Sequence, residues 1–232
     1  MEAVKTGLEV LIQASHPWLT GARLGLLCNP ASVDRDFVHA RDRLMERFPG
    51  QLKALYSPQH GFHAEKQDNM IESDHMTDSA TGLPVYSLYG ETRIPTPQMM
   101  APIDVLLVDL QDVGTRVYTF IYTLSYCLEA AAANGIQVIV LYRPNPINGR
   151  DMEGTVLKPE WTSFVGRFPI PMRHAMTIGE IARLFNTHFG CGAALEVIAM
   201  QGWRRAMWFN DTGLPWVAPS PNMPTATTAM VY

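Results

Sequence analysis

The sequence has few cysteines, no long apolar run and no recognisable export signal. Its three cysteines, Cys28, Cys127 and Cys191, are odd in number, widely spaced and set among apolar residues. This pattern is typical of buried thiols in a reducing compartment. No apolar run is long enough to span a bilayer, and residues 1–13 lack the basic region and apolar core of a secretion signal. We therefore expect a cytoplasmic protein, or a secreted or periplasmic one if a signal peptide has been removed.

Concentrated charge and nucleotide-binding motifs are also absent. The net charge is −4, and the acidic and basic residues are scattered along the chain. Proteins that bind nucleic acid or anionic membranes concentrate basic residues, so we expect neither partner. The first apolar run is not followed by Gly-x-Gly-x-x-Gly, and neither a P-loop nor a Gly-x-Ser-x-Gly nucleophile elbow occurs. We therefore expect no cofactor.

What the chain does contain is an alternation of apolar runs and helical patterns. The runs of strand length are residues 21–29, 52–57, 83–89, 104–110, 136–142 and 195–200, and helical patterns occupy 38–48, 118–135 and 177–190. Such an alternation is typical of a parallel sheet with helices on both faces. With 47% hydrophobic residues, a chain of 232 residues can bury a full core. We predict an α/β fold with a Rossmann-like, doubly wound and mostly parallel sheet.

Two helix boundaries and one domain boundary are also indicated. Thr177 and Glu180 have the spacing of a capping box, and Gly135 and Gly190 stand where helices stop. From Gly202 onward the sequence is rich in Trp, Pro and Asn and has no clear period. We predict a Rossmann-like catalytic domain over residues 1–201 and an aromatic, proline-rich segment over residues 202–232.

The run 103–118 carries the strongest indication of function. Its apolar strand ends in two carboxylates, Asp109 and Asp112, with Arg116 close behind. Strands buried on both faces are almost wholly apolar, and open parallel sheets bind ligands at the carboxyl ends of their strands. The two aspartates are therefore candidate catalytic residues. The alternative is that one of them caps the next helix or forms an ordinary ion pair with Arg116.

Polar side chains follow every predicted strand. They are Asn29, Gln59, His60, Glu91, Arg93, Asp109, Asp112, Arg143, Asn145, Trp203 and Arg204. In a parallel sheet these residues meet at one edge, and such a mixture of charged, amide and aromatic groups suits a polar ligand such as a sugar. The alternative is that they form the ordinary polar loops of any α/β protein.

The connection 61–83 is long and rich in acidic residues, and it contains Glu65. His60 and His63 lie close to these acids, which raises the possibility of a metal-dependent hydrolase. Their spacing matches none of the strong zinc signatures, so we expect no metal site.

Most of the chain resembles a known family, the former DUF1343 family, which is now associated with exo-β-N-acetylmuramidases acting on peptidoglycan fragments. The similar blocks are residues 57–62, 83–100, 104–124, 140–149, 166–186 and 207–225. The resemblance implies a Rossmann-like amino-terminal domain, a smaller carboxyl-terminal domain and an active site in the cleft between them. On that reading, residues 202–232 lead to a smaller domain that this chain lacks and against which it would pack.

The resemblance also implies an activity, the release of terminal N-acetylmuramic acid by a glycoside hydrolase. Family members commonly have glutamate in the Glu-His-Gly motif where this chain has Gln59, and an amide can supply neither a proton nor a full negative charge. The acid role would then pass to Glu65, Asp109 or Asp112. The residues that would hold the sugar and its lactyl carboxylate are Gln59, His60, Arg116, Arg143, Asn145 and Arg173, unless they form structural ion pairs. The other alternative is a sugar-binding or regulatory module that does not cut its ligand.

Overall fold

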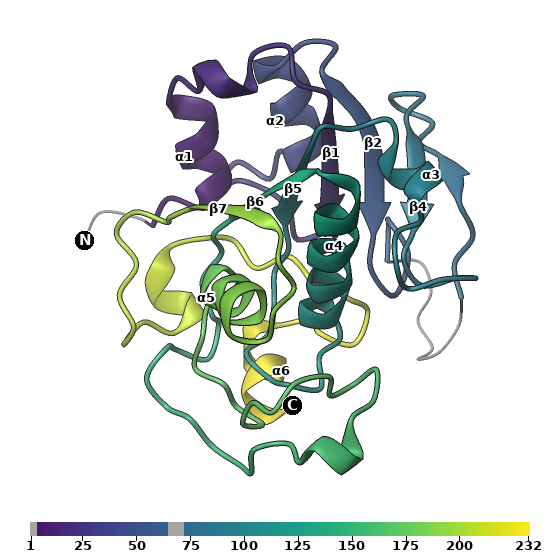
Figure 1. Cartoon of the computed structure of the whole chain (residues 1–232). Helices are drawn as coiled ribbons and strands as arrows, with labels where there is room; N and C mark the ends of the chain where they lie inside the picture. Colours follow the sequence, from purple (N-terminus) through teal and green to yellow (C-terminus); the bar gives the residue numbers. More distant parts are fainter. Residues whose placement is uncertain (1–3, 65–71) are drawn as a thin grey trace.

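The computed structural model describes residues 4–64 and 72–232, which are built around a seven-stranded sheet (Figure 1). The strands are β1 (Leu24–Cys28), β2 (Leu52–Ser57), β3 (Met76–Thr77), β4 (Pro84–Ser87), β5 (Val105–Asp109), β6 (Gln137–Leu141) and β7 (Ala194–Ile198). Their order is β3-β4-β2-β1-β5-β6-β7, and all neighbours are parallel except β3, which runs antiparallel to β4. The predicted α/β fold is confirmed, and each of the six predicted runs contains a strand.

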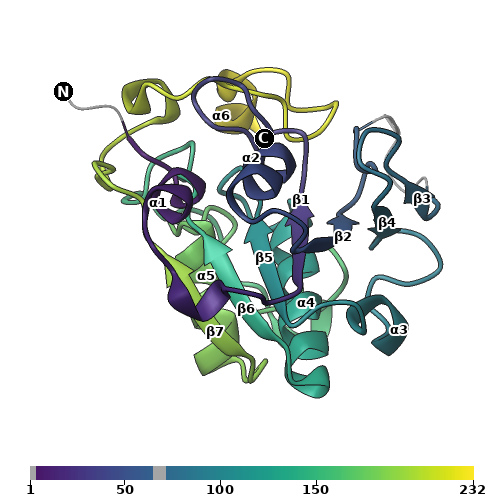
Figure 2. The same ribbon diagram turned by 90° about the horizontal axis from the view of Figure 1, so that it is seen from above.

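Helices cover both faces of the sheet (Figure 2). On one face, α1 (Gly7–Gln13) and α2 (Ala40–Arg47) bury Leu8, Leu11 and Leu44 against the strands. The other face carries α3 (Pro97–Met100), α4 (Phe120–Asn134) and α5 (Ile178–Arg183), the last continuing into a π-helical turn, Leu184–His188. Short 3₁₀ turns lie at Pro17–Leu19, Pro159–Trp161 and Phe209–Thr212. None of the helices within the described ranges is long and apolar enough to cross a bilayer.

Local sequence signals set the ends of the longer helices. The predicted capping box of α5 is present, with the Thr177 hydroxyl accepting from the Glu180 backbone and the Glu180 carboxylate accepting from the Thr177 backbone. Gly135 ends α4 with a left-handed φ of 67°, which glycine adopts without a steric penalty. These caps mark where α5 begins and where α4 ends.

The chain reverses direction across the sheet at β1. From β1 it proceeds through β2 to β4 on one side and then returns to β5 on the other side, so β1 and β5 are neighbours with Cys28 opposite Asp109. Open parallel sheets bind ligands at the carboxyl ends of strands beside such a switch point. The fold therefore directs attention to the loops that follow β1 and β5.

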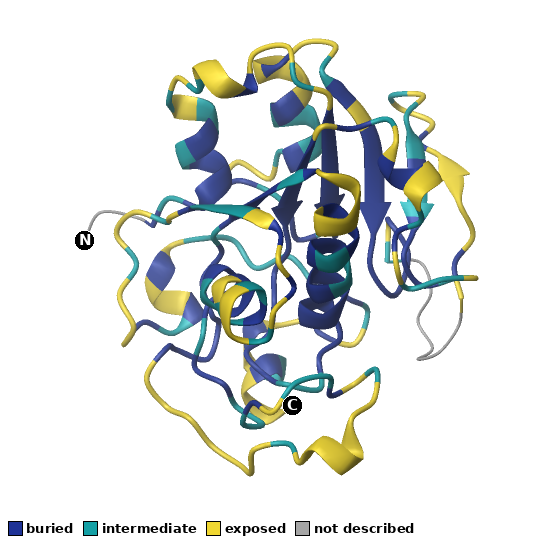
Figure 3. Cartoon of the chain, in the orientation of Figure 1, coloured by how far each residue is buried: buried dark blue, intermediate teal, exposed yellow. Residues whose placement is uncertain are grey.

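Two segments cover the carboxyl edge of the sheet, residues 142–176 after β6 and residues 202–232 (Figure 3). The second segment includes α6 (Ala226–Val231) and buries Met223 and Ala229 in the larger core. Its backbone is tied to the rest of the molecule where Phe209 N–H donates to the Pro146 carbonyl at 3.0 Å. The aromatic, proline-rich segment is therefore packed on the sheet, and the smaller domain expected beyond it stays a prediction.

Candidate active site

Asp109 and Arg143 form a fully buried ion pair at the carboxyl end of β5. The Asp109 side chain has no solvent exposure and that of Arg143 is 5% exposed. The guanidinium approaches both carboxylate oxygens, with Nε 2.5 Å from Oδ1 and Nη2 2.8 Å from Oδ2, and Nη2 also donates to the Val33 carbonyl at 2.9 Å. Such a two-point contact engages both carboxylate oxygens and fixes both side chains.

The side-chain amides of Asn145 and Gln111 near this pair also contact the main chain. Asn145 donates to the Met176 carbonyl at 2.9 Å and accepts from Ile147 N–H at 3.0 Å. The Gln111 side chain donates to the carbonyls of Asp112 and Pro144, at 2.7 Å and 3.0 Å. The edge near Asn145 is therefore a framework that holds the loops after β5 and β6 together.

Arg116 fastens the segment that follows β6. Its Nη1 donates to the carbonyls of Thr155 and Ile170, both at 2.8 Å, and its backbone N–H donates to the Met172 carbonyl at 2.7 Å. These contacts close the base of the excursion formed by residues 155–170. The guanidinium nitrogen that was expected to reach a sugar carboxylate thus holds main-chain carbonyls.

Asp112 has a different environment from Asp109. Its Oδ2 accepts from Gly114 N–H at 2.8 Å and lies 3.3 Å from Nε2 of His174, a fully buried side chain. The His174 Nδ1 accepts from Met176 N–H at 3.2 Å, which leaves the proton of a neutral ring on Nε2, facing Asp112. Within the described part of the chain, Oδ1 of Asp112 is buried and has no hydrogen-bond partner. Asp112 therefore has one oxygen held in place and one that is not.

A small polar cavity lies where β2 and α4 meet. It has a volume of about 60 Å³ and is lined in part by Gln59, His60, Tyr118, Thr119 and Ser220. The Gln59 amide oxygen accepts from the Thr119 hydroxyl at 2.8 Å. His60 has a left-handed φ of 79°, a conformation that costs a non-glycine residue about 1–3 kcal/mol and is concentrated at functional sites. At roughly 10–15 Å³ for each water, the cavity holds a few waters and not a sugar ring.

Tyr118 adds a hydrogen-bond donor to this cavity. Burial raises the pKa of its phenol well above the usual value, and the charge of Asp112 acts in the same direction. The phenol therefore stays protonated at neutral pH and cannot act as a base. Asp112 itself is not among the residues that line this cavity.

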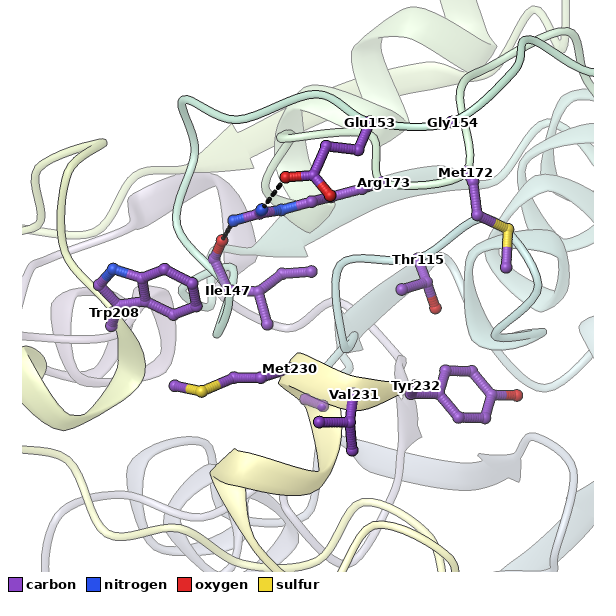
Figure 4. Close-up of a pocket in the computed structure, with 11 residues that line it drawn as sticks. Thr115, Ile147, Glu153, Gly154, Met172, Arg173, Trp208, Met230, Val231 and Tyr232 are labelled. Carbon is purple, nitrogen blue, oxygen red and sulfur yellow. Dashed lines mark hydrogen bonds and ion pairs between the residues drawn. The ribbon is translucent and has the colours of Figure 1, made fainter.

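A larger pocket of about 330 Å³ opens between Arg173 and α6 (Figure 4). Arg173 donates from Nη1 to Glu153 at 2.8 Å and from Nη2 to the Ile147 carbonyl at 2.5 Å, and its guanidinium lies 5.4 Å from the Trp208 ring centre. Thr115, in the loop between β5 and α4, also lines this pocket.

The predicted site residues are thus divided by the structure. Gln59 and His60 line the small cavity, and Arg173 lines the larger pocket. Asp112 lines neither of them and has one buried oxygen without a partner among the described residues. Asp109, Arg116, Arg143 and Asn145 contact the protein itself. Glu65 lies outside the described residues. The prediction did not include His174, Tyr118, Thr119, Thr115 or Trp208. A family resemblance covers all five, but no spacing rule singles out a buried histidine or an unpaired hydroxyl.

Metal ligands do not gather in the part of the chain that the structure describes. Residues 4–64 and 72–232 contain no group of three His, Cys, Asp or Glu side chains placed to hold a metal ion. His39, close to the switch point, is already occupied by the Arg41 N–H and the Asn29 carbonyl. The absence of a metal and of a cofactor stays a prediction.

The mostly parallel sheet with helices on both faces defines an α/β domain of Rossmann-like topology, with a small polar cavity among the loops that follow its strands. The sequence model of the family described as "Exo-beta-N-acetylmuramidase NamZ, N-terminal" matches residues 24–227. The chain belongs to this family.

Known proteins agree with that placement over almost the whole chain. The chain is 49% identical over 229 residues to the peptidoglycan beta-N-acetylmuramidase NamZ of Bacillus subtilis (strain 168), covering 99% of this chain and 55% of that protein. Two crystal structures of DUF1343 family proteins from Bacteroides fragilis NCTC 9343 are similar to it. One has a TM-score of 0.89 and 43% identity, covering 99% of this chain and 58% of the other. The second has a TM-score of 0.80 and 32% identity, with 99% and 60% coverage. The chain thus spans little more than half the length of these relatives.

Proposed function

We propose that the natural full-length protein is an exo-β-N-acetylmuramidase that releases terminal N-acetylmuramic acid from peptidoglycan fragments. The observation that carries this proposal is the 49% identity, over 99% of the chain, to a peptidoglycan beta-N-acetylmuramidase. The small polar cavity supports it, because its hydroxyl, amide and imidazole groups can hydrogen-bond one edge of a sugar whose ring lies outside the cavity.

Among the described carboxylates, we assign the role of general acid to Asp112. Hydrolysis of a glycosidic bond needs a group that protonates the leaving oxygen and that can reach it. Both oxygens of Asp109 are engaged by Arg143, whereas Asp112 keeps one oxygen without a partner among the described residues. The Gly114 N–H holds the other oxygen of Asp112 at 2.8 Å and thereby orients the carboxyl group, with His174 Nε2 3.3 Å away. Asp109 and Arg143 act as positioning residues beneath the site.

The remaining substrate contacts fall to the small cavity and its surroundings. Gln59, fixed by Thr119, can orient a sugar hydroxyl or a water molecule but cannot transfer a proton. The Tyr118 phenol, kept protonated by its burial, can donate a hydrogen bond to developing negative charge. Arg116, Arg143 and Asn145 support the loops that hold these groups.

The activity is tested with a chromogenic β-glycoside of N-acetylmuramic acid and the natural full-length protein. We expect release of the chromophore, and no release from the matching N-acetylglucosamine glycoside. Asp112→Asn should lower the turnover number about 100-fold or more, as loss of a general acid does. If Glu65→Gln has that effect while Asp112→Asn does not, the acid lies in the 61–83 connection. The matched control is Glu72→Gln, an exposed carboxylate in the same connection.

A second candidate function is sugar binding without hydrolysis. The observation that favours it is Gln59, whose neutral amide accepts a hydrogen bond where a family glutamate would present a carboxylate. In that case the wild-type protein binds N-acetylmuramic acid but releases no chromophore. Gln59→Glu then restores turnover, because it returns a titratable group to the end of β2. Turnover by the wild type at a rate above that of Gln59→Glu rejects this candidate.

The compartment and the domain partner belong to the same proposal. All three cysteines lie in described residues and have buried, free thiols, which fits the cytoplasmic placement expected from the sequence. Cell fractionation tests it. The aromatic, proline-rich segment would in addition contact the smaller domain, and we expect no nucleic acid or membrane partner.

A further inference from the structure

A fully buried histidine lies beside the carboxylate assigned as the general acid. The His174 side chain has no solvent exposure, and its Nε2 lies 3.3 Å from Oδ2 of Asp112, whose side chain is 5% exposed. Neither Nε2 of His174 nor Oδ1 of Asp112 makes a hydrogen bond within the described residues. Buried polar atoms in native proteins are nearly always paired, so two unpaired ones in neighbouring side chains call for an explanation such as a catalytic role.

Two turns of the backbone bring His174 and Asp112 together. Gly114 has a φ of 90°, and a Cβ at this position would lie 2.6 Å from the amide oxygen of Asn145. Ala175, next to His174, also has a left-handed φ, of 54°. The turns are joined where His174 N–H donates to the Gly114 carbonyl at 3.3 Å, and Gly114 N–H donates to Asp112 Oδ2 at 2.8 Å. A left-handed residue other than glycine persists only where its surroundings fix it, and such residues cluster at functional sites.

A hydrogen bond on the far side of the His174 ring decides where its proton lies. Met176 N–H donates to Nδ1 at 3.2 Å, so Nδ1 has no proton and the proton of the ring is on Nε2. The Asn145 side chain donates to the Met176 carbonyl at 2.9 Å and holds that residue in place. His174 therefore presents an N–H, and not a lone pair, to Asp112.

These donors distinguish the two oxygens of Asp112. Oδ2 accepts from Gly114 N–H and faces a second N–H, that of His174. A proton on Oδ2 would meet both of these N–H groups, so the proton of the acid form belongs on Oδ1. Oδ1 is also the oxygen that has no partner among the described residues. The oxygen that carries the proton is therefore the one left for a substrate.

The same contacts act when the proton leaves. As the bond between the sugar carbon and the leaving oxygen breaks, Oδ1 gives its proton to that oxygen and Asp112 becomes a carboxylate, to which solvent later returns a proton. The new negative charge spreads over both oxygens, and Oδ2 then meets the N–H groups of Gly114 and His174. Hydrogen bonds of catalytic groups are often long in the free enzyme and tighten in the complex, so the 3.3 Å contact can shorten at this step.

We propose that His174 is the positioning residue of the general acid: its Nε2–H directs the transferable proton to Oδ1 of Asp112 and stabilises the carboxylate that remains after transfer. The inference rests on the proposed function, because it needs Asp112 to be the acid. His174 lines neither the small cavity nor the larger pocket, so it acts through Asp112 and not on the substrate. Its loss should therefore change the turnover number and not KM.

Two substitutions separate the two sides of the ring. His174→Asn keeps an acceptor near the position of Nδ1 for Met176 N–H but has no atom near Nε2. His174→Gln keeps an N–H near Nε2 but loses the acceptor for Met176 N–H. A purely structural role makes His174→Gln the more harmful change, whereas positioning of the acid makes His174→Asn the more harmful one.

The measurement uses the natural full-length protein and two β-glycosides of N-acetylmuramic acid, one that releases phenol and one that releases dinitrophenol. Dinitrophenolate leaves without a proton, whereas phenol needs one from the acid. We expect His174→Asn to lower the turnover number about 10–100-fold for the phenyl glycoside and less than about threefold for the dinitrophenyl glycoside, as misalignment of an acid implies. KM should stay within about twofold for both, and His174→Gln should keep the wild-type ratio of the two turnover numbers.

This ratio does not depend on the fraction of the protein that is folded, so partial misfolding of a variant cannot imitate the result. The matched control is His188→Asn, which replaces an exposed histidine in contact with Phe189 and should leave the ratio unchanged. Nitrogen NMR of labelled histidine gives a second readout. The His174 signals, assigned with His174→Gln, should show a protonated Nε2 and an unprotonated Nδ1, and the opposite tautomer overturns the inference.

The outcomes also separate this inference from the proposed function. If Asp112→Asn changes the ratio but His174→Asn lowers both turnover numbers equally, or if His174→Gln changes the ratio and His174→Asn does not, the positioning role of His174 is wrong and the acid stands. If the wild type hydrolyses neither glycoside, or if Asp112→Asn leaves the ratio unchanged, the proposed function or its acid is wrong, and the inference is overturned with it.

Discussion

Asp109 and Asp112 are close in sequence, yet their surroundings give them different roles. Asp109 lies against Arg143 with no access to solvent, and removing one partner of such a pair leaves a buried charge without compensation. Asp112 faces His174 and Gly114 and contributes less to holding the sheet edge together. We therefore expect substitution of Asp109 to change mainly the free energy of unfolding and substitution of Asp112 to change mainly the turnover number.

Asp109→Asn is expected to lower the free energy of unfolding by about 3–5 kcal/mol, because Arg143 would then face a neutral amide. The measurement is urea unfolding followed by circular dichroism. The matched control, Glu46→Gln, removes an exposed carboxylate 3.5 Å from Arg43 and should cost less than about 1 kcal/mol. If the two variants lose similar amounts of unfolding free energy, the buried pair stabilises the fold no more than the exposed one does.

For single residues, the sequence predicted position in the fold but not the contact partners. The position of Asp109, Arg143 and Asn145 at the carboxyl edge followed from their places after apolar runs, and the sheet brings them there. Which of them contact one another did not follow, because the partners are far apart in the chain. The contact between Arg116 and the carbonyls of Thr155 and Ile170 is of the same kind.

At the scale of single elements, α2 has an unusual cap. His39 precedes it, and its Nδ1 accepts from Arg41 N–H while its Nε2 lies 3.1 Å from the Asn29 carbonyl. Burial lowers the pKa of His39, although the hydrogen bond to the Asn29 carbonyl opposes that shift. Protonation would place a second N–H against the Arg41 N–H and so remove the cap.

This cap is expected to make the protein sensitive to mild acid. The unfolded chain titrates at about the usual histidine pKa of 6.5 and therefore takes up the proton before the folded state does. The stabilisation by neutral His39 is complete above about pH 6.5 and is lost as the pH falls toward the lowered folded-state pKa. His39→Asn keeps a capping acceptor that cannot be protonated. Its urea midpoint should change less than that of the wild type between pH 7.5 and 5.5, and equal changes would contradict this account.

The first helix depends on a close approach that helix propensity does not reveal. Gly7 N–H donates to the Tyr142 carbonyl at 2.8 Å, and a Cβ at this position would lie 2.3 Å from the Tyr142 nitrogen. Gly7→Ala should therefore lower the free energy of unfolding by about 1–3 kcal/mol, as overpacking does, although propensity alone predicts a gain of about 1 kcal/mol. Urea unfolding decides the sign. Gln13→Ala, an exposed change in the same helix, is the control and should have little effect.

Elements with a clear period were predictable and short ones were not. The apolar runs gave β1, β2, β4, β5, β6 and β7, whereas β3 has only two residues and therefore no period to detect. The helix α1 was also missed, although Thr6 and Glu9 form a capping box with the same spacing as Thr177 and Glu180. That signal was present in the sequence, and only seven helical residues follow it.

At the scale of the whole molecule, the fold should hold together without a metal ion. The core is formed by apolar clusters on both faces of the sheet, and the described residues include no triplet of metal ligands. Exhaustive chelation should therefore leave the melting temperature unchanged within about 1 °C, measured by scanning fluorimetry. A drop that zinc reverses would favour the metal-dependent hydrolase that the sequence left open.

For the whole molecule, the sequence predicted the fold class and the family, and the structure shows how the carboxyl-terminal segment packs. Composition and periodicity led to the α/β class, and the resemblance led to the family. The division of the chain at residue 201 was drawn from a change in composition, yet Met223 and Ala229 beyond it lie in the larger core. Composition reports what a segment contains and not what it packs against, so the boundary stays a prediction.

The hydrogen bonds from Arg116 to the Thr155 and Ile170 carbonyls affect which residues near them can change in sequence. One guanidinium nitrogen holds carbonyls near both ends of the 155–170 excursion, and Arg167 and Phe168 within it contact α4 and Phe185. Only the outer part of the stretch, around Trp161, can therefore change sequence without disturbing these contacts. Trp161 and Val165 in that stretch are already exposed, while Glu153, Met172 and Arg173 lie outside the tied ends and keep their places at the pocket. The outer surface around Trp161 can therefore change in sequence at little cost to the stability of the residues beneath it.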